Sequence, residues 1–360
     1  MSQAPGTATR VVVAMSGGVD SSVTAALLKE QGFDVIGVTL RLWDGPGNEG
    51  GCCSVDDAAD ARRVADRLGI PFYALNYAEP FREKVVDNFV AEYMAGRTPN
   101  PCARCNQFIK FDRLLAQARD LGADYLATGH YARIDRDGGR ARLRTGLDGA
   151  KDQSYFLSVT PAAELDSILF PVGELDKDRV RELATRYDLI TADKPESQDI
   201  CFVQSSAAEF VASQGAGTAL APGEIVDRAG NVLGEHRGAA FYTVGQRRGL
   251  NIAAGRPLYV VEVDTAANRV VVGEADEVFQ SAMEVADLNW FGDPLPAEGR
   301  EALVKVRYAG QPVPARVTPL ADDRARVAFA EPVRAVTPGQ VAAFYDGDEV
   351  LGGAWIAEAA

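Results

Sequence analysis

The feature that most constrains this chain is the way its first apolar run ends. Residues 11–22 read VVVAMSGGVDSS, so a strand-like run passes directly into a serine and glycine loop and then into a helical pattern. Glycines let the backbone approach an anion, and a helix N-terminus offers unsatisfied N–H groups and the positive end of a dipole. This order predicts a phosphate-binding turn at the edge of a parallel sheet.

The residues of this loop suit a nucleotide. The sequence has neither the Gly-Lys-Ser/Thr of a Walker A loop nor the spacing G-x-G-x-x-G. Asp20 offers oxygen ligands for Mg²⁺ beside a polyphosphate, because hard cations prefer oxygen. The alternative interpretation is an ordinary strand-to-helix turn of a doubly wound fold. The small residues around Asp20 are Ser16, Gly17, Gly18, Ser21 and Ser22.

Up to about residue 210, strand-like runs alternate with runs at helical spacing. Gly32, Gly69 and Gly122 each follow an expected helix, where a C-cap glycine belongs. Alternation of this kind predicts an α/β domain with a doubly wound parallel sheet. We expect strands at Val11–Met15, Val35–Leu42, Phe72–Leu75 and Tyr125–Thr128, and helices at Ser21–Gln31, Val55–Leu68, Pro80–Met94 and Phe108–Leu121.

From Gly215 onward, glycine and proline punctuate short β-rich runs, a pattern typical of hairpins in a small barrel or sandwich. We expect three domains: a catalytic α/β domain over 1–213, a small mixed module rich in β structure over 214–280, and a C-terminal β-barrel over 281–360. The β-rich runs are Leu258–Val263, Arg269–Val272, Leu303–Tyr308, Arg324–Phe329 and Gln340–Phe344.

Composition narrows the class of protein. The chain carries 37 Lys and Arg against 51 Asp and Glu, a formal charge of −14, which argues against broad nonspecific nucleic-acid binding but leaves room for a local basic groove. With 47% hydrophobic and 24% charged residues, the chain is globular. No run approaches the ~20 apolar residues of a membrane helix, and the start MSQAPGTATR lacks a signal-peptide core. We expect a cytoplasmic enzyme.

Five cysteines are too few and too unevenly placed for a disulfide scaffold, and in a reducing compartment they indicate redox, sulfur or metal chemistry. Cys102 and Cys105 have C-x-x-C spacing in a proline-rich loop, just before a helix expected to begin near Phe108. Arg104 and the helix N-terminus should lower the pKa of Cys105, which makes it a candidate nucleophile. A structural metal knuckle is the alternative, although a second C-x-x-C is absent. The other cysteines are Cys52, Cys53 and Cys201.

Seven motifs in order across nearly the whole chain resemble the tRNA-specific 2-thiouridylase (MnmA) family of PP-loop ATP pyrophosphatases. They are SGGVDSS, GRTPNPxxxCN, ATGHYAR, KDQSYFL, SQDICF, GQRRGL and TPGQ. The resemblance implies a PP-loop sheet of the adenine nucleotide hydrolase-like kind. It also implies formation of 2-thiouridine at the wobble position of tRNA, with ATP, Mg²⁺ and a persulfide that comes from a cysteine desulfurase directly or through relay proteins.

The resemblance also assigns roles to cysteines. Cys105, directly before the Asn of its motif, corresponds to the nucleophile, and Cys201 to the persulfide carrier, so the two would form a disulfide during turnover. Cys102 stands where the family has an Asp proposed as general acid/base. The alternative is a [4Fe-4S] cluster held by Cys102, Cys105 and Cys201. Cys52 and Cys53 match no motif, and we interpret them as ordinary loop cysteines.

The remaining site residues rest on the same resemblance. Without it, Leu40 would be read as core, and His130 either as core or as a ligand contact at the carboxyl end of its strand. The run 151–153 would be read as a capped helix start, and Arg307 with Tyr308 as polar positions on an exposed strand. For ATP binding it implies Ala14, Met15, Ser16, Gly17, Gly18, Val19, Asp20 and Ser21, with Leu40 on the adenine and Gly129 beside the adenosine. For tRNA binding it implies Asn100, Pro101, His130, Lys151, Asp152, Gln153, Arg307, Tyr308 and Gln340.

Three rival functions share parts of this pattern. A PP-loop amidotransferase or ligase would use the same first loop but would leave the cysteine pair unexplained. A different tRNA thiolase would use an iron–sulfur cluster and another base. A nonenzymatic ATP sensor would release no pyrophosphate with tRNA.

Overall fold

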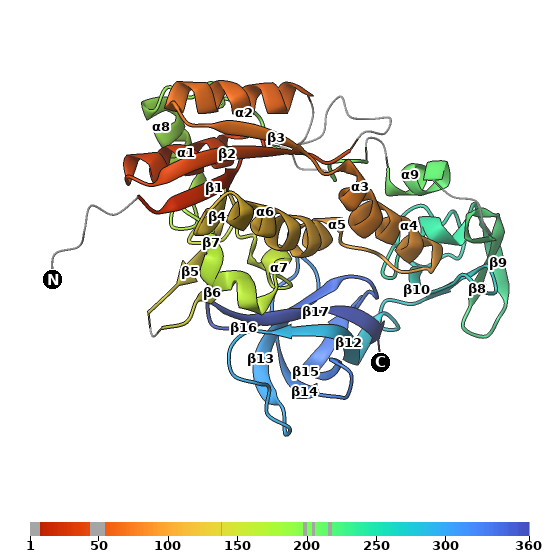
Figure 1. The fold of residues 1–360 in the computed structure, drawn as a ribbon. Helices are drawn as coiled ribbons and strands as arrows, with labels where there is room; N and C mark the ends of the chain where they lie inside the picture. The colour runs from red at the N-terminus through yellow and green to blue at the C-terminus, as the bar shows by residue number, and fades with distance from the viewer. Residues whose placement is uncertain are drawn as a thin grey trace. The chain divides into compact units, whose positions relative to one another are not determined.

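The computed structural model describes residues 8–43, 55–137, 139–196, 200–203, 206–214 and 218–359. The chain divides into two compact units. Unit 1 comprises Met1–Lys84, Arg104–Gln204 and Asp348–Val350, and unit 2 comprises Val85–Ala103, Ser205–Gly347 and Leu351–Ala360. Figure 1 traces the chain in order by colour. Among the described helices, none has the length and apolar character needed to cross a membrane.

Unit 1 is built on a parallel sheet of order β3-β2-β1-β4-β7, which confirms the predicted doubly wound architecture. The chain moves outward from β1 to β3 and then returns to place β4 on the other side of β1. The topological switch point therefore lies at the carboxyl ends of β1 and β4, where such sheets bind ligands. The strands are β1 (Arg10–Ala14), β2 (Asp34–Arg41), β3 (Phe72–Asn76), β4 (Tyr125–Thr128) and β7 (Ile168–Leu169).

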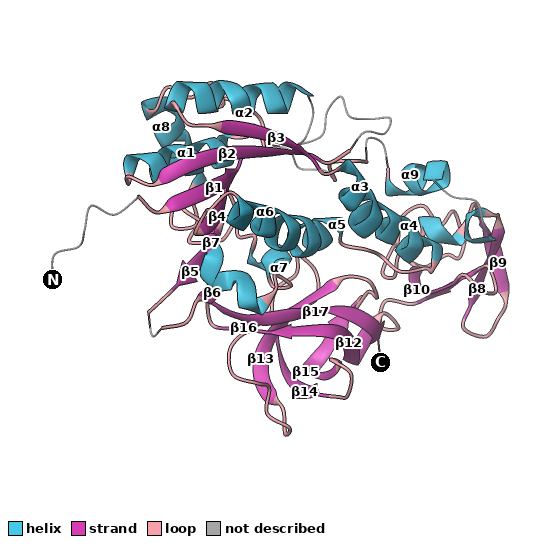
Figure 2. Ribbon diagram, in the orientation of Figure 1, coloured by secondary structure: helices cyan, strands magenta, loops and turns pink. Residues whose placement is uncertain are grey.

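Both faces of this sheet are covered, as a parallel sheet requires. Val11 and Val13 belong to one core cluster with residues of α1, α2 and α8, whereas Val12, equally buried, points to the other face because side chains alternate along a strand. Helix α6 contacts β4. Figure 2 shows these helices around the sheet. They are α1 (Val19–Glu30), α2 (Val55–Leu68), α8 (Lys177–Arg186) and α6 (Leu115–Asp120).

The C-cap prediction is confirmed, since Gly32, Gly69 and Gly122 have φ values of 88°, 62° and 71°. Two predicted helices differ from the structure. Pro80–Met94 is divided by a wider π-helical turn into α3 (Ala78–Phe81), η1 (Arg82–Val86) and α4 (Asp87–Met94). The expected start near Phe108 is wrong, because the helical run is α5 (Pro101–Arg104), η2 (Cys105–Leu114) and then α6.

The early start of that helical run has a local cause. The buried side chain of Asn100 accepts a hydrogen bond from the Ala103 N–H at 3.1 Å, and Pro101 follows at the first helical position. Asparagine is a strong N-cap, and proline suits the first helical position because its missing N–H would have no partner there. Cys102 thus lies in the first turn, and Cys105 lies one turn further on.

Unit 1 also contains a β-hairpin that the sequence pattern did not indicate. Its strands are β5 (Ala132–Asp135) and β6 (Arg142–Thr145), and Arg133 and Arg144 pair with the carboxylate of Asp348 at 2.8 and 2.7 Å. These pairs explain why a short piece of the late chain belongs to unit 1. The short elements α7 (Ser154–Leu157) and η3 (Ala162–Ser167) follow the hairpin.

Within unit 2, a four-stranded sheet has the order β10-β11-β8-β9, with β8 and β11 parallel and the other pairs antiparallel. Its strands pack on a core of Ile225, Tyr242, Leu258 and Val260 with their neighbours. The elements are α9 (Ala207–Gln214), η4 (Thr218–Leu220), β8 (Gly223–Asp227), β9 (Val232–His236), η5 (Ala239–Phe241), β10 (Tyr259–Asp264) and β11 (Arg269–Gly273).

The C-terminal strands of unit 2 form a closed barrel of order β12-β15-β14-β13-β16-β17, closed by pairing of β12 with β17, and the predicted barrel is confirmed. Arg307 and Tyr308, expected on a strand, instead lie in the turn after β13. The strands are β12 (Phe279–Trp290), β13 (Arg300–Lys305), β14 (Val313–Pro319), β15 (Ala325–Arg334), β16 (Val341–Asp346) and β17 (Glu349–Ala359).

Candidate functional site

The serine and glycine loop lies at the switch point of the parallel sheet. It follows β1, and Gly129 follows β4 on the neighbouring strand. A Cβ atom added at Gly129 would lie 2.7 Å from the Ser21 nitrogen and 2.8 Å from the Asp20 carbonyl carbon. The two loops are therefore in backbone contact, and Gly129 has a packing reason to lack a side chain.

Small residues of the loop itself fix its conformation. Gly17 has φ +76°, and a Cβ there would lie 2.2 Å from the carbonyl oxygen of Asp57 at the start of α2. The Ser21 hydroxyl accepts a hydrogen bond from the Ser16 N–H at 3.2 Å and donates to the Gly18 carbonyl at 3.1 Å. The Ser22 hydroxyl donates to the same carbonyl at 2.8 Å. These bonds fix the loop without using an external ligand.

The first turn of α1 is available to an anion. Gly18 is the N-cap, and no side chain in the described part of the chain caps this turn. Helix N-termini with unsatisfied N–H groups bind phosphate through those groups and through the dipole. Met15 and Val19 are almost completely buried, so their contribution to a nucleotide would come from their backbone.

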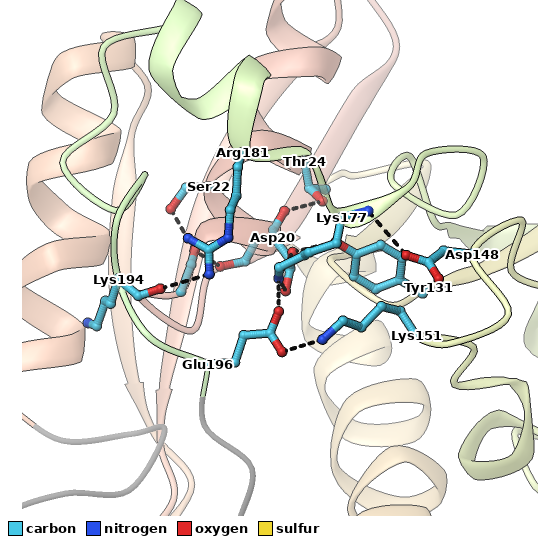
Figure 3. A network of polar contacts seen from close by, with 12 residues as sticks. Asp20, Ser22, Thr24, Tyr131, Asp148, Lys151, Lys177, Arg181, Lys194 and Glu196 are labelled. Carbon is cyan, nitrogen blue, oxygen red and sulfur yellow. Dashed lines mark hydrogen bonds and ion pairs between the residues drawn. The ribbon is translucent and has the colours of Figure 1, made fainter. Parts of the chain in front are cut away.

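Asp20 is the centre of a network of ionic contacts (Figure 3). Its carboxylate contacts the Lys177 Nζ at 2.7 and 3.0 Å and accepts a hydrogen bond from the Tyr131 hydroxyl at 2.8 Å. The Lys177 side chain is only 11% exposed, and a buried ammonium group is tolerated only when it is paired. Burial, followed by the charge of Asp20, raises the pKa of Tyr131, so its hydroxyl stays protonated and donates.

Sequence reasoning missed Lys177. It is the first residue of α8, where the positive end of the helix dipole disfavours a cation. The sequence signal was a lysine directly after the N-cap residue Asp176, because a cation at this unfavourable position indicates a nearby negative charge.

Glu196 extends the network. Its carboxylate contacts the Lys177 Nζ at 2.6 Å and the Lys151 Nζ at 2.7 Å. Burial alone would raise the pKa of Glu196, but the hydrogen bonds from Lys151 and Lys177 outweigh it and lower the value to about 2. The hydrogen bond from Glu196 in turn raises the pKa of Lys151. The result is a chain of alternating charges that runs from Lys151 through Glu196 and Lys177 to Asp20.

The segment that precedes Cys201 is held in place by hydrogen bonds and ion pairs as far as Glu196. The Lys194 Nζ contacts the carboxylates of Asp57 and Asp60 at 2.7 and 2.6 Å, and the Arg181 guanidinium donates to the Ala192 carbonyl at 2.7 Å. Residues 197–199 of the SQDICF motif lie outside the described residues. Beyond them Cys201 is half-buried.

Two aromatic contacts hold the residue after Cys201. The buried ring of Phe202 packs against Phe81 and Trp43, with ring centroids 5.7 and 6.2 Å apart. Phe81 ends α3, and α3 packs on η2, which begins with Cys105. Cys105 and Cys201 are therefore carried by segments with a common packing partner inside unit 1.

The cysteines differ in accessibility. Cys105 is buried and Cys102 is exposed. Within the described ranges, no group of three His, Cys, Asp or Glu side chains is arranged to hold a metal ion, so the three-cysteine cluster gains no support from the structure. Cys52 and Cys53 lie outside the described residues.

His130 lies just beyond β4. Its Nδ1 is 2.6 Å from the Thr128 hydroxyl, and its Nε2 is 3.5 Å from the Lys110 Nζ. Burial and the charge of Lys110 both lower the pKa of His130. The ring is therefore neutral near pH 7, and any RNA contact that it makes is a hydrogen bond or a stacking contact.

Comparisons with known proteins cover almost the whole chain. Residues 9–205 match the model of the tRNA methyl transferase HUP domain, 210–274 that of the tRNA methyl transferase PRC-barrel domain, and 280–356 that of the aminomethyltransferase beta-barrel domain. The tRNA-specific 2-thiouridylase MnmA of Geobacter metallireducens is 54% identical over 355 residues, which are 96% of each chain. The protein of the same name from Carboxydothermus hydrogenoformans is 52% identical over 96% of this chain and 97% of its own.

This chain belongs to the tRNA-specific 2-thiouridylase MnmA family. The family resemblance drawn from the seven motifs is thereby confirmed. The residues that it implicates in RNA contact can now be placed, and several of them have structural partners.

Residues 151–153, for which the sequence resemblance predicts tRNA contacts, are tied into unit 1. Asp152 accepts hydrogen bonds from the Gly146 N–H and from Ser154, and the Gln153 side chain accepts one from the Tyr131 N–H at 3.0 Å. The side chains of Asp152 and Gln153 thus fix their own loop, whereas the partly exposed Lys151 pairs with Glu196.

In unit 2, Gln340 contacts the GRTPNP loop. Its side-chain amide donates to the carbonyls of Thr98 and Pro99 at 3.0 and 3.1 Å. The Thr98 N–H donates to the Pro338 carbonyl at 2.9 Å. The TPGQ motif therefore holds the GRTPNP loop by hydrogen bonds within unit 2.

Arg307 and Tyr308 lie together in their turn. Tyr308 is 41% exposed, and the Lys305 Nζ lies 5.4 Å from the centre of its ring. An exposed ring beside two cations suits stacking and phosphate contact. Leu40, by contrast, is buried on β2 in register with Leu75 of β3.

Proposed function

We propose that this chain is a tRNA-uridine 2-sulfurtransferase that uses ATP to replace the C2 oxygen of the wobble uridine by sulfur, with 2-thiouridine, AMP and pyrophosphate as products. The observation that carries the proposal is similarity to named tRNA-specific 2-thiouridylases at about half identity over nearly the full length of both chains. The position of the serine and glycine loop at the sheet's switch point, with its uncapped helix N-terminus, supports this loop as the ATP site.

In the first step, the uracil C2 oxygen attacks the α-phosphorus of ATP, and pyrophosphate leaves. The uncapped first turn of α1 would bind phosphate oxygens. Lys177 would neutralise negative charge there, because its ammonium lies beside Asp20 in the same turn. Both Lys177 and Asp20 belong to unit 1, so this step depends on contacts that one unit supplies.

Asp20 also fits a Mg²⁺ ion that accompanies ATP. Magnesium is usually held in such sites by one or two carboxylates together with substrate phosphates and water, so a single carboxylate beside a phosphate loop is a sufficient protein contribution. When bound, the ion would neutralise phosphate charge. The Lys177 ammonium would then contact the Asp20 carboxylate together with the ion, or turn toward the phosphates.

In the second step, the outer sulfur of a persulfide on Cys201 attacks C2, and AMP leaves. The Cys105 thiolate then attacks the Cys201 sulfur; the bond between that sulfur and the transferred sulfur breaks, and its electron pair stays with the new thiocarbonyl sulfur. Alternatively, Cys105 attacks first and releases hydrosulfide, which then attacks C2. Both routes end with a Cys105–Cys201 disulfide, which an external thiol reductant returns to two thiols.

The sulfur of Cys201 would come from a cysteine desulfurase or from a relay protein that carries a persulfide. The half-buried position of Cys201 supports access by such a donor. Cys102 is exposed and stands where the family has an acidic residue, so we assign it a proton-relay role that a hydroxyl group can also perform.

The test is thiouridine formation by the wild-type enzyme and three serine variants, with tRNA, ATP and a sulfide or persulfide source, read by nucleoside mass spectrometry. We expect Cys105→Ser and Cys201→Ser to lose sulfur transfer and Cys102→Ser to keep part of it. Complete loss in all three, together with a brown iron–sulfur absorbance in anaerobic wild-type protein, would replace the persulfide route by the cluster.

Methyl transfer, which the domain-model descriptions mention, is tested in the same reaction. A methylated base in place of 2-thiouridine would refute the proposal. Absence of 2-thiouridine from a deletion strain, with its return on complementation, would establish the activity in cells.

A further inference from the structure

The GQRRGL turn of unit 2 has no part in the mechanism above, yet several hydrogen bonds and a close backbone contact fix it. Gly245 has φ +86°, and a Cβ there would lie 2.5 Å from the Cβ of Ala335. The Gly245 N–H donates to the Val260 carbonyl at 2.8 Å, and the Val260 N–H donates to the Gln246 carbonyl at 2.9 Å. The turn is thus attached to the first residues of β10.

The side chain of Gln246 closes the turn on itself. It accepts a hydrogen bond from the Thr243 N–H at 3.1 Å and donates one to the Arg248 carbonyl at 3.0 Å. Because both ends of the turn are fixed by one side chain, Arg247 and Arg248 project from a backbone of defined shape. Both arginines are exposed.

Arg247 and Arg248 differ from three other arginines on or beside the same sheet, while a fourth, Arg237, stacks over the Phe241 ring at 5.0 Å from its centre. Arg228, Arg256 and Arg269 each pair with a glutamate. Arg247 and Arg248 make no ion pair with any residue that the structure describes. In a chain with 51 acidic and 37 basic residues, adjacent arginines left without acids on a fixed turn indicate an anionic ligand from outside.

The surface beside Arg247 combines positive charge with apolar side chains. A cavity of about 210 Å³ is lined by Arg247 and Arg256 and by the apolar side chains of Leu250, Ile252 and Leu258. Arginine matches phosphate through two parallel hydrogen bonds, and an apolar surface suits the face of a ribose.

A hydrogen-bonded path joins this turn to the loop that precedes Cys102. The Thr243 hydroxyl lies 3.2 Å from the Thr98 hydroxyl, and Thr98 belongs to the GRTPNP loop. Thr243 in turn bonds to Gln246 of the arginine turn. The two motifs are therefore neighbours in unit 2, and a tRNA whose target base reaches the GRTPNP loop would bring backbone phosphates to the arginines.

We propose that Arg247 and Arg248 form a phosphate-binding subsite for the tRNA backbone near the target nucleotide. This inference rests on the proposed function, since it assumes that tRNA is the substrate. The subsite supplies affinity and register without reading sequence, because phosphate contacts are the same for every nucleotide.

The experiment compares the double variant Arg247→Gln, Arg248→Gln with a matched control, Arg228→Gln, Arg269→Gln. Both remove two positive charges from the same sheet, but the control arginines are paired with Glu277 and Glu224. Binding of a tRNA transcript and of its anticodon-arm hairpin is measured over a range of salt concentrations, together with kcat and KM for thiolation. Melting temperatures verify that the variants are folded.

We expect the subsite variant to bind both RNAs roughly tenfold more weakly at ~0.1 M salt, and its slope of log affinity against log salt to fall by about one to two units. KM for tRNA should rise by a similar factor, with kcat at saturating tRNA retained. The control should change much less in affinity and slope.

Two results would overturn the subsite. The first is an equal loss in the control, which would show a general effect of charge. The second is unchanged tRNA binding with loss of sulfur transfer from a persulfide-carrying protein but not from inorganic sulfide, which would assign the arginines to a protein partner. Failure of wild-type protein to make 2-thiouridine would instead refute the proposed function, whatever the arginines do.

Discussion

The two loops to which the proposed function assigns the chemistry are held in different ways. In unit 1 the nucleotide loop is surrounded by alternating charges, in which Lys177 lies between Asp20 and Glu196. In unit 2 the GRTPNP loop is held mainly by neutral hydrogen bonds, in which the Gln340 amide donates to two backbone carbonyls and the Thr98 hydroxyl donates to that of Thr243. One ion pair, between Arg97 and Glu92, fixes the start of the loop. Ion pairs can be exchanged for a charged ligand, whereas neutral bonds to backbone carbonyls fix a shape. The charges around Asp20 therefore suit the exchange of an anion, whereas the bonds from Gln340 and the Arg97–Glu92 pair fix the shape of the GRTPNP loop.

The largest effect should come from removing the cation of unit 1. Lys177→Met leaves Asp20 and Glu196 without their shared partner, so negative charge would repel the phosphates of ATP. We expect pyrophosphate release with tRNA and ATP to fall about 100-fold or more, the range seen when one electrostatic contact to a reacting group is lost. Glu182→Gln, on the exposed face of the same helix, is the control.

The charge model also predicts that the effects of the network are not additive. Asp20→Asn combined with Lys177→Met should cost less than the sum of the two single changes, because the residues share one interaction. Additive losses would mean that Lys177 acts on ATP independently of Asp20, and that the nucleotide loop does not depend on the ion pair between them.

A second prediction uses two glycines to separate the loops. Gly17→Ala would place its Cβ 2.2 Å from the Asp57 carbonyl, and Gly339→Ala would place its Cβ 2.9 Å from the Thr98 carbonyl, both at positive φ. We expect Gly17→Ala to lose ATP binding, and Gly339→Ala to keep ATP affinity but lose most thiolation. Calorimetric ATP titration and thiouridine yield measure the two effects.

Gly32→Ala is the control for backbone strain, since Gly32 has φ +88° and nothing lies within 4 Å of its added Cβ. It should cost about 1–2 kcal/mol of stability with no loss of ATP binding. Equal effects of the Gly17 and Gly339 substitutions on ATP affinity would contradict the division of labour between the loops.

A third prediction concerns Gln340, whose amide donates to two carbonyls. Gln340→Met removes the donor, and Gln340→Glu in addition places negative charge beside the same carbonyl oxygens. We expect thiolation to fall about tenfold in the first variant and further in the second, because each hydrogen bond contributes about 1 kcal/mol. A change in the salt dependence of tRNA binding in Gln340→Met would instead indicate direct contact with RNA.

The smallest predicted effect is the pH dependence of stability from the chain's two histidines, one in each unit. Burial and Lys110 lower the pKa of His130, and burial lowers that of His236. Since the unfolded value is about 6.5, the unfolded chain binds more protons below that pH. These groups therefore favour the fold above pH 6.5, and that contribution is lost as pH falls toward their folded pKa values.

Urea unfolding between pH 5 and 8 measures this effect. His130→Gln should flatten the acid side of the stability profile more than His236→Gln, because its pKa is lowered further. If both substitutions leave the pH dependence of the unfolding free energy unchanged, carboxylates and not histidines control the loss of stability at acid pH in both units.

The sequence by itself determined the parallel sheet, the phosphate loop and the family, because these depend on local patterns. Apolar runs of strand length, Gly17 and Gly18 before a helix, and C-cap glycines such as Gly32 act over a few neighbouring residues. The start of the helix at Pro101 was also within reach of the sequence, since Asn100 and Pro101 form a recognisable N-cap.

Only the tertiary structure decided which distant side chains meet. Lys177 and Glu196 join Asp20 across more than 150 residues of chain, and Gln340 reaches Thr98 across 242. No periodicity encodes such pairs, because a long side chain at a helix start or in a loop has many equivalent partners until the backbone is folded. Burial then selects among these partners, because a charge removed from water is stable only beside an opposite charge, and a buried amide only when it is hydrogen-bonded.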